Sequence, residues 1–178
     1  MNLWHDFNFT RISPDDFVAV IEISRGSKNK YELDKETGAL ILDRVLYTST
    51  HYPANYGFIP LSYADDNDPL DVLVLCSESI QPLATVRCYP IGVIAMSDEG
   101  AMDYKIIAIP FGDPNYNTYR DVSELPPHIM QEMVHFFNVY KQLEHKNTTV
   151  VDVFGVERAR KVIIESLKNY KEKFGQNE

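Results

Sequence analysis

The order of the hydrophobic patterns most constrains the fold of this chain, because strand-like runs come first and helix-like repeats come last. Short runs rich in β-branched and aromatic residues, separated by turns of Asp, Asn, Gly and Pro, are typical of β-strands. Such runs predict six strands, over residues 17–24, 30–33, 39–47, 70–76, 85–96 and 104–109.

The pattern changes after two consecutive prolines at 126 and 127. Apolar side chains then recur every three or four residues, which predicts an amphipathic helix over about 128–145. A second helix is predicted over 156–174, where Gly155 precedes the repeat and Gly175 follows it. Strands followed by helices predict an α+β fold, in which an antiparallel sheet or barrel carries helices on its outside. Periodicity alone leaves the kind of barrel open.

No repeat, low-complexity tract or flexible linker divides the 178 residues, so a single domain over residues 1–178 is predicted. Cys76 and Cys88 do not form a Cys-x-x-Cys pair, so we expect neither a disulfide framework nor a zinc site. The first ten residues do not resemble a signal peptide and no apolar run could span a bilayer, so we expect a cytoplasmic protein. The net charge of −9 argues against nucleic acid or an anionic membrane as a partner.

The stretch DDNDPLDV, residues 65–72, carries the strongest chemical signal. Hard divalent cations prefer oxygen ligands, and Asp66, Asp68 and Asp71 could converge on one small volume around the stiff Pro69 turn. Carboxylates brought together repel one another unless a cation lies between them. A solvated acidic turn ahead of a strand is the alternative. A calcium loop of the EF-hand type does not fit, because its twelfth position would be Ser77 instead of glutamate.

A second acidic segment lies between two predicted strands and contains Asp98 and Asp103. Asp103 and Lys105 are two residues apart and would share one face of a strand. The same spacing joins Lys30 and Glu32. In each pair the cation could contact a phosphate oxygen or simply neutralise its neighbour.

Several further residues are weak signals when taken one at a time. Glu22 interrupts an apolar strand, where a charge needs a partner, a metal or a solvent-facing position. Arg44 could bind phosphate through two nitrogens or lie on the surface. The rigid segment YPANYGFIP, residues 52–60, could offer tyrosine hydroxyls to a ligand or serve as aromatic packing. Tyr140 belongs to the apolar face of the predicted helix, and Lys141 beside it has the character of a solvent-exposed charge.

Taken together and in this order, these segments resemble the family I soluble inorganic pyrophosphatases. The resemblance covers about residues 17–145. Its most specific parts are the Asp-x-Asp-Pro-x-Asp-Val element beside the Tyr-Pro-x-Asn-Tyr-Gly element. The residues that carry it are Glu22, the 30–32 trio, Arg44, the segment 52–60, Asp66, Asp68, Asp71, Asp98, Asp103, Lys105, Tyr140 and Lys141.

The resemblance implies an OB-like five-stranded antiparallel β-barrel with flanking α-helices, a homo-oligomer with a hexamer favoured, and pyrophosphate as substrate. It implies Mg²⁺ as cofactor, held by Asp66, Asp71, Asp98 and Asp103. It makes Asp68 the base that takes the proton of the attacking water. Phosphate oxygens would be bound by Lys30, Arg44, Tyr56, Tyr140 and Lys141, and the outer part of the site would be shaped by Glu22, Glu32 and Lys105.

The charge balance is consistent with this assignment. The chain has 26 acidic and 17 basic residues, and removal of the seven proposed site carboxylates leaves 19 acidic residues, so the excess falls from 9 to 2. Three alternatives stay open: an OB-type binding module, a structural calcium-binding protein, and a phosphatase acting on nucleotides or phosphoesters. The acidic sign of the cluster argues against an oligonucleotide groove, which is expected to be basic.

Overall fold

The computed structural model describes residues 1–175. Its strands are β1 (Phe17–Ile23), β2 (Asn29–Leu33), β3 (Leu40–Val45), β4 (Asn55–Phe58), β5 (Asp71–Val74), β6 (Thr85–Asp98), β7 (Ala101–Pro110) and β8 (Thr148–Gly155). Its helices are α1 (Pro127–Val139) and α2 (Val156–Phe174), with 3-10 turns η1 (Phe9–Arg11), η2 (Val122–Glu124) and η3 (Gln142–Glu144).

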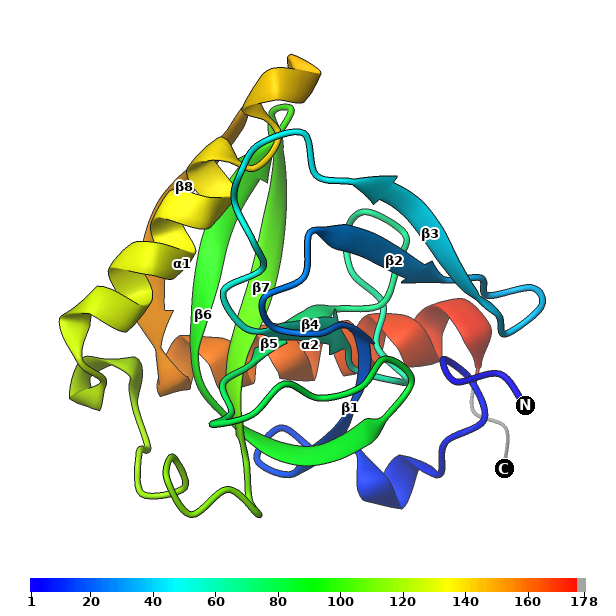
Figure 1. Ribbon diagram of the computed structural model, residues 1–178. Coiled ribbons are helices and arrows are strands. Elements are labelled where there is room, and N and C mark those ends of the chain that lie inside the picture. Colours follow the sequence, from blue (N-terminus) through cyan, green and yellow to red (C-terminus); the bar gives the residue numbers. More distant parts are fainter. Residues whose placement is uncertain (176–178) are drawn as a thin grey trace.

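A closed five-stranded barrel forms the centre of the molecule (Figure 1). Its strands follow the order β1-β4-β5-β7-β6, and β6 pairs again with β1 to close the ring. The predicted OB-like barrel is therefore confirmed, but its strands are not all antiparallel. β5 and β7 run parallel, because the chain passes through the long β6 before it returns beside β5. β8 extends the sheet next to β6.

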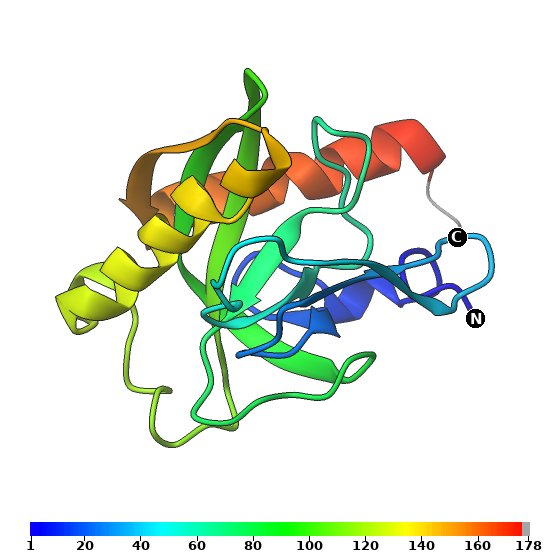
Figure 2. The same ribbon diagram turned by 45° about the horizontal axis from the view of Figure 1, so that its top comes forward.

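The β2–β3 hairpin forms a separate two-stranded sheet that projects over one end of the barrel (Figure 2). Residue 30 on β2 lies opposite residue 44 on β3, so the two predicted cations occupy neighbouring positions. The long β6–β7 hairpin reaches up beside α1 and carries Asp98 at the end of β6. The β2–β3 hairpin and the β6–β7 hairpin therefore lie at the same end of the barrel.

The six predicted strands are all present, and two further strands were missed. β4 is only four residues long and lies inside the Tyr-, Pro- and Gly-rich segment, which reads as a turn. β8 is half-exposed, and Asp152 interrupts its apolar residues, so apolar and polar side chains do not alternate regularly along it. The first helix was predicted over about 128–145, but α1 ends at Val139, so Tyr140 and Lys141 lie in the junction before η3 and not on the helix.

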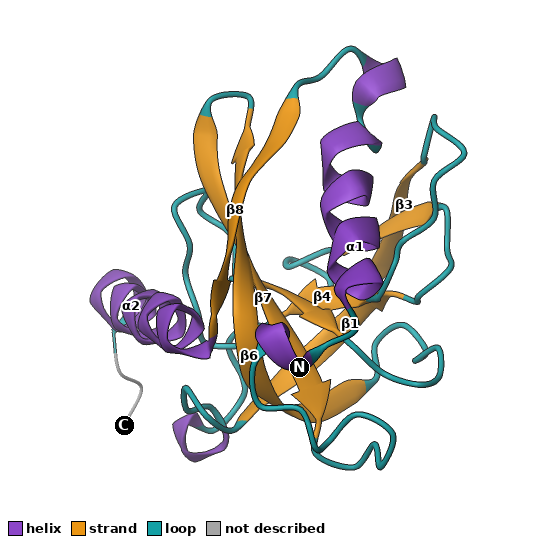
Figure 3. Cartoon of the chain, turned by 90° about the vertical axis from the view of Figure 1, so that its left-hand side faces the viewer, coloured by secondary structure: helices purple, strands orange, loops and turns teal. Residues whose placement is uncertain are grey.

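The two helices cover opposite sides of the sheet (Figure 3). The buried face of α2, formed by Ala159, Ile163 and Tyr170, packs on one apolar cluster of the barrel. The buried face of α1, which includes Met133 and Phe137, packs on a second cluster beneath β6 and β7. Within residues 1–175, no helix has the length and apolar character needed to cross a membrane.

Asn55 fixes the segment that leads into β4. Its side chain is fully buried, and its Oδ1 accepts hydrogen bonds from the backbone N–H groups of Arg25 (3.0 Å) and Ile80 (2.9 Å). Its Nδ2 donates to the carbonyl oxygens of Glu78 (3.2 Å) and Val74 (3.4 Å). All hydrogen-bonding positions of the amide are used, so this asparagine joins three loops at one point.

Gly57 lies where β4 crosses closest to β1. A Cβ atom at this position would lie 1.8 Å from the carbonyl oxygen of Val20, which is backbone and cannot rotate away. Since Gly57 pairs with Ile21 in the antiparallel ladder, the close approach is part of barrel closure. Close packing of β4 on β1 therefore requires glycine at position 57.

We predict that Gly57→Ala lowers the free energy of unfolding by ~3 kcal/mol or more, because the added methyl forces β1 and β4 apart. Urea unfolding followed by circular dichroism measures this loss. Gly112→Ala is the matched control, since no atom lies within 4 Å of the Cβ position there. Equal stabilities of the two variants would contradict the steric role of Gly57.

Candidate active site

A polar cavity of about 330 Å³ opens at the barrel end beneath the β2–β3 hairpin. All of the predicted site residues line it except Arg44. Residues from β1, β2, β4, β5, β6 and β7 meet there with the junction after α1. The structure therefore brings together side chains that are more than a hundred positions apart in the sequence.

Three carboxylates form the acidic centre of this cavity. One oxygen each of Asp66, Asp71 and Asp103 lies within 4.8 Å of the others. Asp71 begins β5 and Asp103 lies on β7, while Asp66 comes from the loop between β4 and β5. Asp98, the fourth predicted metal ligand, lines the same cavity but pairs instead with Lys141, whose Nζ lies 2.8 Å from its Oδ2.

The loop that carries Asp66 and Asp68 is fixed by short local hydrogen bonds. The Asp68 N–H donates to Asp66 Oδ1 (3.1 Å), and Asn67 between them has a positive φ of 66°. The buried Ser62 hydroxyl accepts from the N–H of Leu70 (2.8 Å), which fixes the end of the loop just before β5. The turn therefore positions the Asp66 carboxylate through the backbone of Asp68.

Lys105 is the buried cation of the acidic centre. It is 2% exposed, and its Nζ donates to Tyr56 Oη and Asp71 Oδ2, both at 2.9 Å. Asp103 Oδ2 lies 3.1 Å away. Burial lowers the pKa of Lys105, but Asp71, Tyr56 and Asp103 more than offset this, so its pKa stands well above the usual value. Lys105 was expected in the outer part of the site and instead lies deep inside it.

The crowding of carboxylates shows in their protonation. Burial, together with the charge of Asp71, raises the pKa of Asp66 to about 6. Burial also raises the pKa of Asp103, with Lys105 opposing the shift and Asp71 adding to it. One lysine therefore does not neutralise the three carboxylates, and the site favours added positive charge.

Glu22 is a buried carboxyl group at the wall of the cavity. It is 8% exposed, and its Oε2 accepts a hydrogen bond from the N–H of Leu33 (2.7 Å). Burial raises its pKa to about 7, although the Leu33 N–H opposes the shift. Glu22 was expected in the outer site and is in fact buried, whereas Glu32 is exposed and pairs with Lys30.

Arg44 does not line the cavity, because neighbouring carboxylates hold its guanidinium group. Its Nη1 donates to Asp43 (2.6 Å), and its Nε lies 2.7 Å from Glu144 Oε1. Among residues 1–175, the buried Arg44 Nη2 and Glu144 Oε2 have no hydrogen-bond partner. Burial lowers the pKa of Arg44, and its two carboxylate partners raise it to a net value above normal.

Sequence reasoning missed three residues of this region. Lys35 lines the cavity and its Nζ lies 3.4 Å from Asp68 Oδ1. Glu144 lies on η3 and pairs with Arg44 from a distant part of the chain, so no local pattern could have indicated it. Asn55 was part of a recognised segment, but only the structure gives it a role in packing.

The donor set fits a hard divalent cation. All oxygens of the acidic centre are carboxylates, and their mutual distances suit a common ion. No sulfur or imidazole ligand belongs to this cluster. Asp66, Asp71 and Asp103 are therefore the residues that would hold such an ion.

The barrel thus carries at one end a cavity that combines three converging carboxylates with several lysines. The sequence model of the family described as "Inorganic pyrophosphatase" matches residues 19–171. The chain is 48% identical over 171 residues to "Soluble inorganic pyrophosphatase 2" of Chlamydomonas reinhardtii, covering 96% of this chain and 89% of that protein. It is 46% identical to "Soluble inorganic pyrophosphatase 1" of Arabidopsis thaliana, covering 95% and 80%.

Solved structures agree with the sequence comparison. The inorganic pyrophosphatase of Thermus thermophilus is 36% identical, with a TM-score of 0.92 over 96% of this chain and 99% of that one. The enzyme of Helicobacter pylori is 43% identical, with a TM-score of 0.87 over 89% and 95%. The chain belongs to the inorganic pyrophosphatase family.

The raised pKa of Glu22 predicts a pH-dependent loss of stability. A carboxyl group that keeps its proton better when folded stabilises the fold below its unfolded pKa of 4.5, and this contribution disappears as the pH rises through about 7. The shift corresponds to ~3 kcal/mol. We expect Glu22→Gln to be more stable than the parent by up to this amount at about pH 8, and to show no such gain near pH 4.5.

Urea unfolding in the presence of chelator, at both pH values, measures this difference. Glu36→Gln on the exposed turn after β2 is the matched control and should follow the parent at both pH values. The same stability difference between Glu22→Gln and the parent at both pH values would contradict the buried, proton-holding role of Glu22.

Proposed function

We propose that this chain hydrolyses inorganic pyrophosphate to two orthophosphates in the cavity at the barrel end. The observation that carries the proposal is that one cavity contains groups of both charge signs. A three-carboxylate centre lies beside four lysines, at positions 30, 35, 105 and 141. A cavity lined by charges of one sign would suit a cation or an anion alone. This cavity is lined by both signs and suits a polyanion bound together with cations.

Asp66, Asp71 and Asp103 are the proposed holders of Mg²⁺, with Asp98 at the edge of the same group. When bound, the metal supplies screening of the substrate charge and a lower pKa for the attacking water. Asp98 can join this group only if its pairing with Lys141 loosens, which leaves that lysine available for a phosphate oxygen.

Asp68 is the proposed general base. Its side chain is 57% exposed, it lies two residues from Asp66 and it lines the cavity. Its weak contact with Lys35 at 3.4 Å leaves carboxylate oxygen available to accept a proton. A base needs an accessible lone pair near the water, and Asp71, paired at 2.9 Å with Lys105, is less suited to this role.

Lys30, Tyr56, Tyr140 and Lys141 are proposed to bind phosphate oxygens, and all four line the cavity. Burial raises the pKa of both tyrosines, so they remain hydroxyl donors. Arg44 is proposed to join them, which requires its guanidinium to leave Asp43 and Glu144 and turn toward the cavity. Fixed donors that stabilise charge as it develops on the leaving phosphate need no covalent intermediate. Glu22, Glu32 and Lys105 support this set through the contacts described above.

Phosphate release from pyrophosphate by the purified chain tests the proposal directly. We expect rapid release with Mg²⁺ and loss of release when a chelator is added, because the acidic centre needs a cation to accept the substrate. ATP and a phosphoester serve as comparison substrates and should be turned over more slowly. A folded sample without activity in Mg²⁺, Mn²⁺ or Co²⁺ would overturn the enzymatic assignment.

Asp68→Asn and Asp71→Asn should separate a base from a metal ligand. We expect Asp68→Asn to lower kcat ~10²–10⁴-fold with little change in the magnesium concentration at half-maximal activity. Asp71→Asn should raise that magnesium concentration, since it removes one of the three converging oxygens. Steady-state kinetics over a magnesium series measures both. Turnover near the parent value for Asp68→Asn would remove Asp68 from the role of base.

A further inference from the structure

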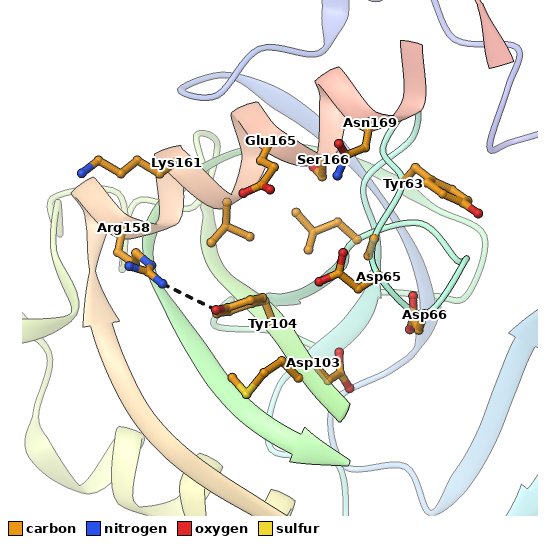
Figure 4. Close-up of a pocket in the computed structure, with 14 residues that line it drawn as sticks. Tyr63, Asp65, Asp66, Asp103, Tyr104, Arg158, Lys161, Glu165, Ser166 and Asn169 are labelled. Atoms are coloured by element: carbon orange, nitrogen blue, oxygen red, sulfur yellow. Dashed lines mark hydrogen bonds between the residues drawn. The ribbon is translucent and has the colours of Figure 1, made fainter. Parts of the chain in front are cut away.

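A second cavity, drawn in Figure 4, adjoins the acidic centre and shares two of its carboxylates. It has a volume of about 280 Å³ and lies between the 63–66 loop, the start of β7 and the exposed side of α2. Asp66 and Asp103 line both this cavity and the proposed catalytic cavity. A molecule bound here would therefore contact the back of the proposed metal site without entering it.

The floor of this second cavity is apolar. It is formed by side chains from three segments, Ala64, Leu70, Met102, Tyr104 and Val162. Leu70 is only 2% exposed, and Arg158 on α2 closes one end by approaching the Tyr104 hydroxyl at 3.5 Å. A space of this size with an apolar floor and a few polar groups at its rim suits a small organic molecule.

The charged side chains at the rim of the cavity favour a ligand of one charge sign. The carboxylates of Asp65 and Glu165 extend into the space, whereas the Lys161 ammonium extends away from them (Figure 4). The ion pairs formed by α2 use other residues, joining Arg160 to Asp15 and Lys168 to Glu172. The lining holds four carboxylates, at 65, 66, 103 and 165, against two cations, at 158 and 161.

A bare metal ion does not suit this place. Among residues 1–175, the carboxylates that converge closely enough to share an ion are Asp66, Asp71 and Asp103, and neither Asp65 nor Glu165 belongs to that group. An apolar floor also gives an inorganic cation nothing to coordinate. A cation with an apolar body uses both parts of the cavity.

We propose that this cavity binds a small organic ammonium ion, with its apolar body on the Leu70 and Val162 floor and its charge between Asp65 and Glu165. Bound there, the positive charge lies on the far side of Asp66 and Asp103 and weakens their hold on Mg²⁺. Because coupling between two sites is reciprocal, Mg²⁺ weakens ammonium binding to the same extent. The site is thus an inhibitory one, and its link to activity rests on the proposed function.

Methyl-resolved NMR of the full chain, without metal or pyrophosphate, tests binding with phenethylamine as the probe. We expect saturable shifts at Leu70, Val162 and Met102, with a dissociation constant in the millimolar range expected for a ligand this small. 3-Phenylpropionate, which has a similar body and the opposite charge, should not produce them. Shifts that do not saturate, or equal binding of both probes, would overturn the proposal.

Glu165→Gln and Asp65→Asn should each weaken phenethylamine binding at least about fivefold. Both residues are exposed, so neither change endangers folding. Glu157→Gln on the same helix, whose side chain lies outside the cavity and is 79% exposed, is the matched control and should bind as the parent does. Unchanged affinity in Glu165→Gln would overturn the assigned position of the charge.

Calorimetric titration with Mg²⁺ measures the coupling independently of turnover. Saturating phenethylamine should weaken Mg²⁺ binding about fivefold in the parent, and Glu165→Gln should need at least about fivefold more phenethylamine to reach the same effect. Unchanged Mg²⁺ affinity in the parent would overturn the inhibitory link. Because the NMR and calorimetric measurements use no pyrophosphate, a failure of the proposed hydrolytic activity would be recognised separately, by absent phosphate release.

Discussion

The whole site depends on one buried ammonium group, that of Lys105. Asp71 and Asp103 lie at the end of a closed barrel, where burial and mutual repulsion both oppose ionised carboxylates. Lys105, which is 2% exposed, offsets part of this cost by bonding to Asp71 and Tyr56 and lying 3.1 Å from Asp103. One positive charge does not balance three converging carboxylates. The fold therefore tolerates its acidic centre but leaves it short of positive charge.

The barrel topology explains why these groups meet. The parallel pairing of β5 with β7 sets Asp71 directly opposite Lys105, and Asp103 lies two residues earlier on the same face of β7. The close crossing of β1 and β4 at Gly57 closes the ring that holds Glu22 and Tyr56 at the same end. Chemistry at the barrel end is thus set by pairings between distant strands.

The sequence was enough to predict six of the eight strands and the second helix, because β-branched runs and helical repeats are local patterns. Asp66 and Asp71 could be grouped from their spacing around Pro69, but Asp103 could be added only through a family resemblance, since its position beside them depends on strand pairing. β4 was missed because it is only four residues long, and β8 because its apolar and polar residues do not alternate regularly. The Arg44–Glu144 pair could not be predicted at all, since it joins a hairpin to a 3-10 turn one hundred residues later.

Buried polar groups in and beside the proposed site lower the stability of the folded protein. Glu22 is held in a place that raises its pKa to about 7, and Arg44 Nη2 and Glu144 Oε2 are buried without partners among the described residues. Such groups each cost stability in the unliganded protein, since buried polar atoms lose their water. The cations and the polyanion proposed for this site would return part of this free energy by mass action, because they would bind the folded chain. The buried groups that cost stability would therefore be the same groups that favour binding.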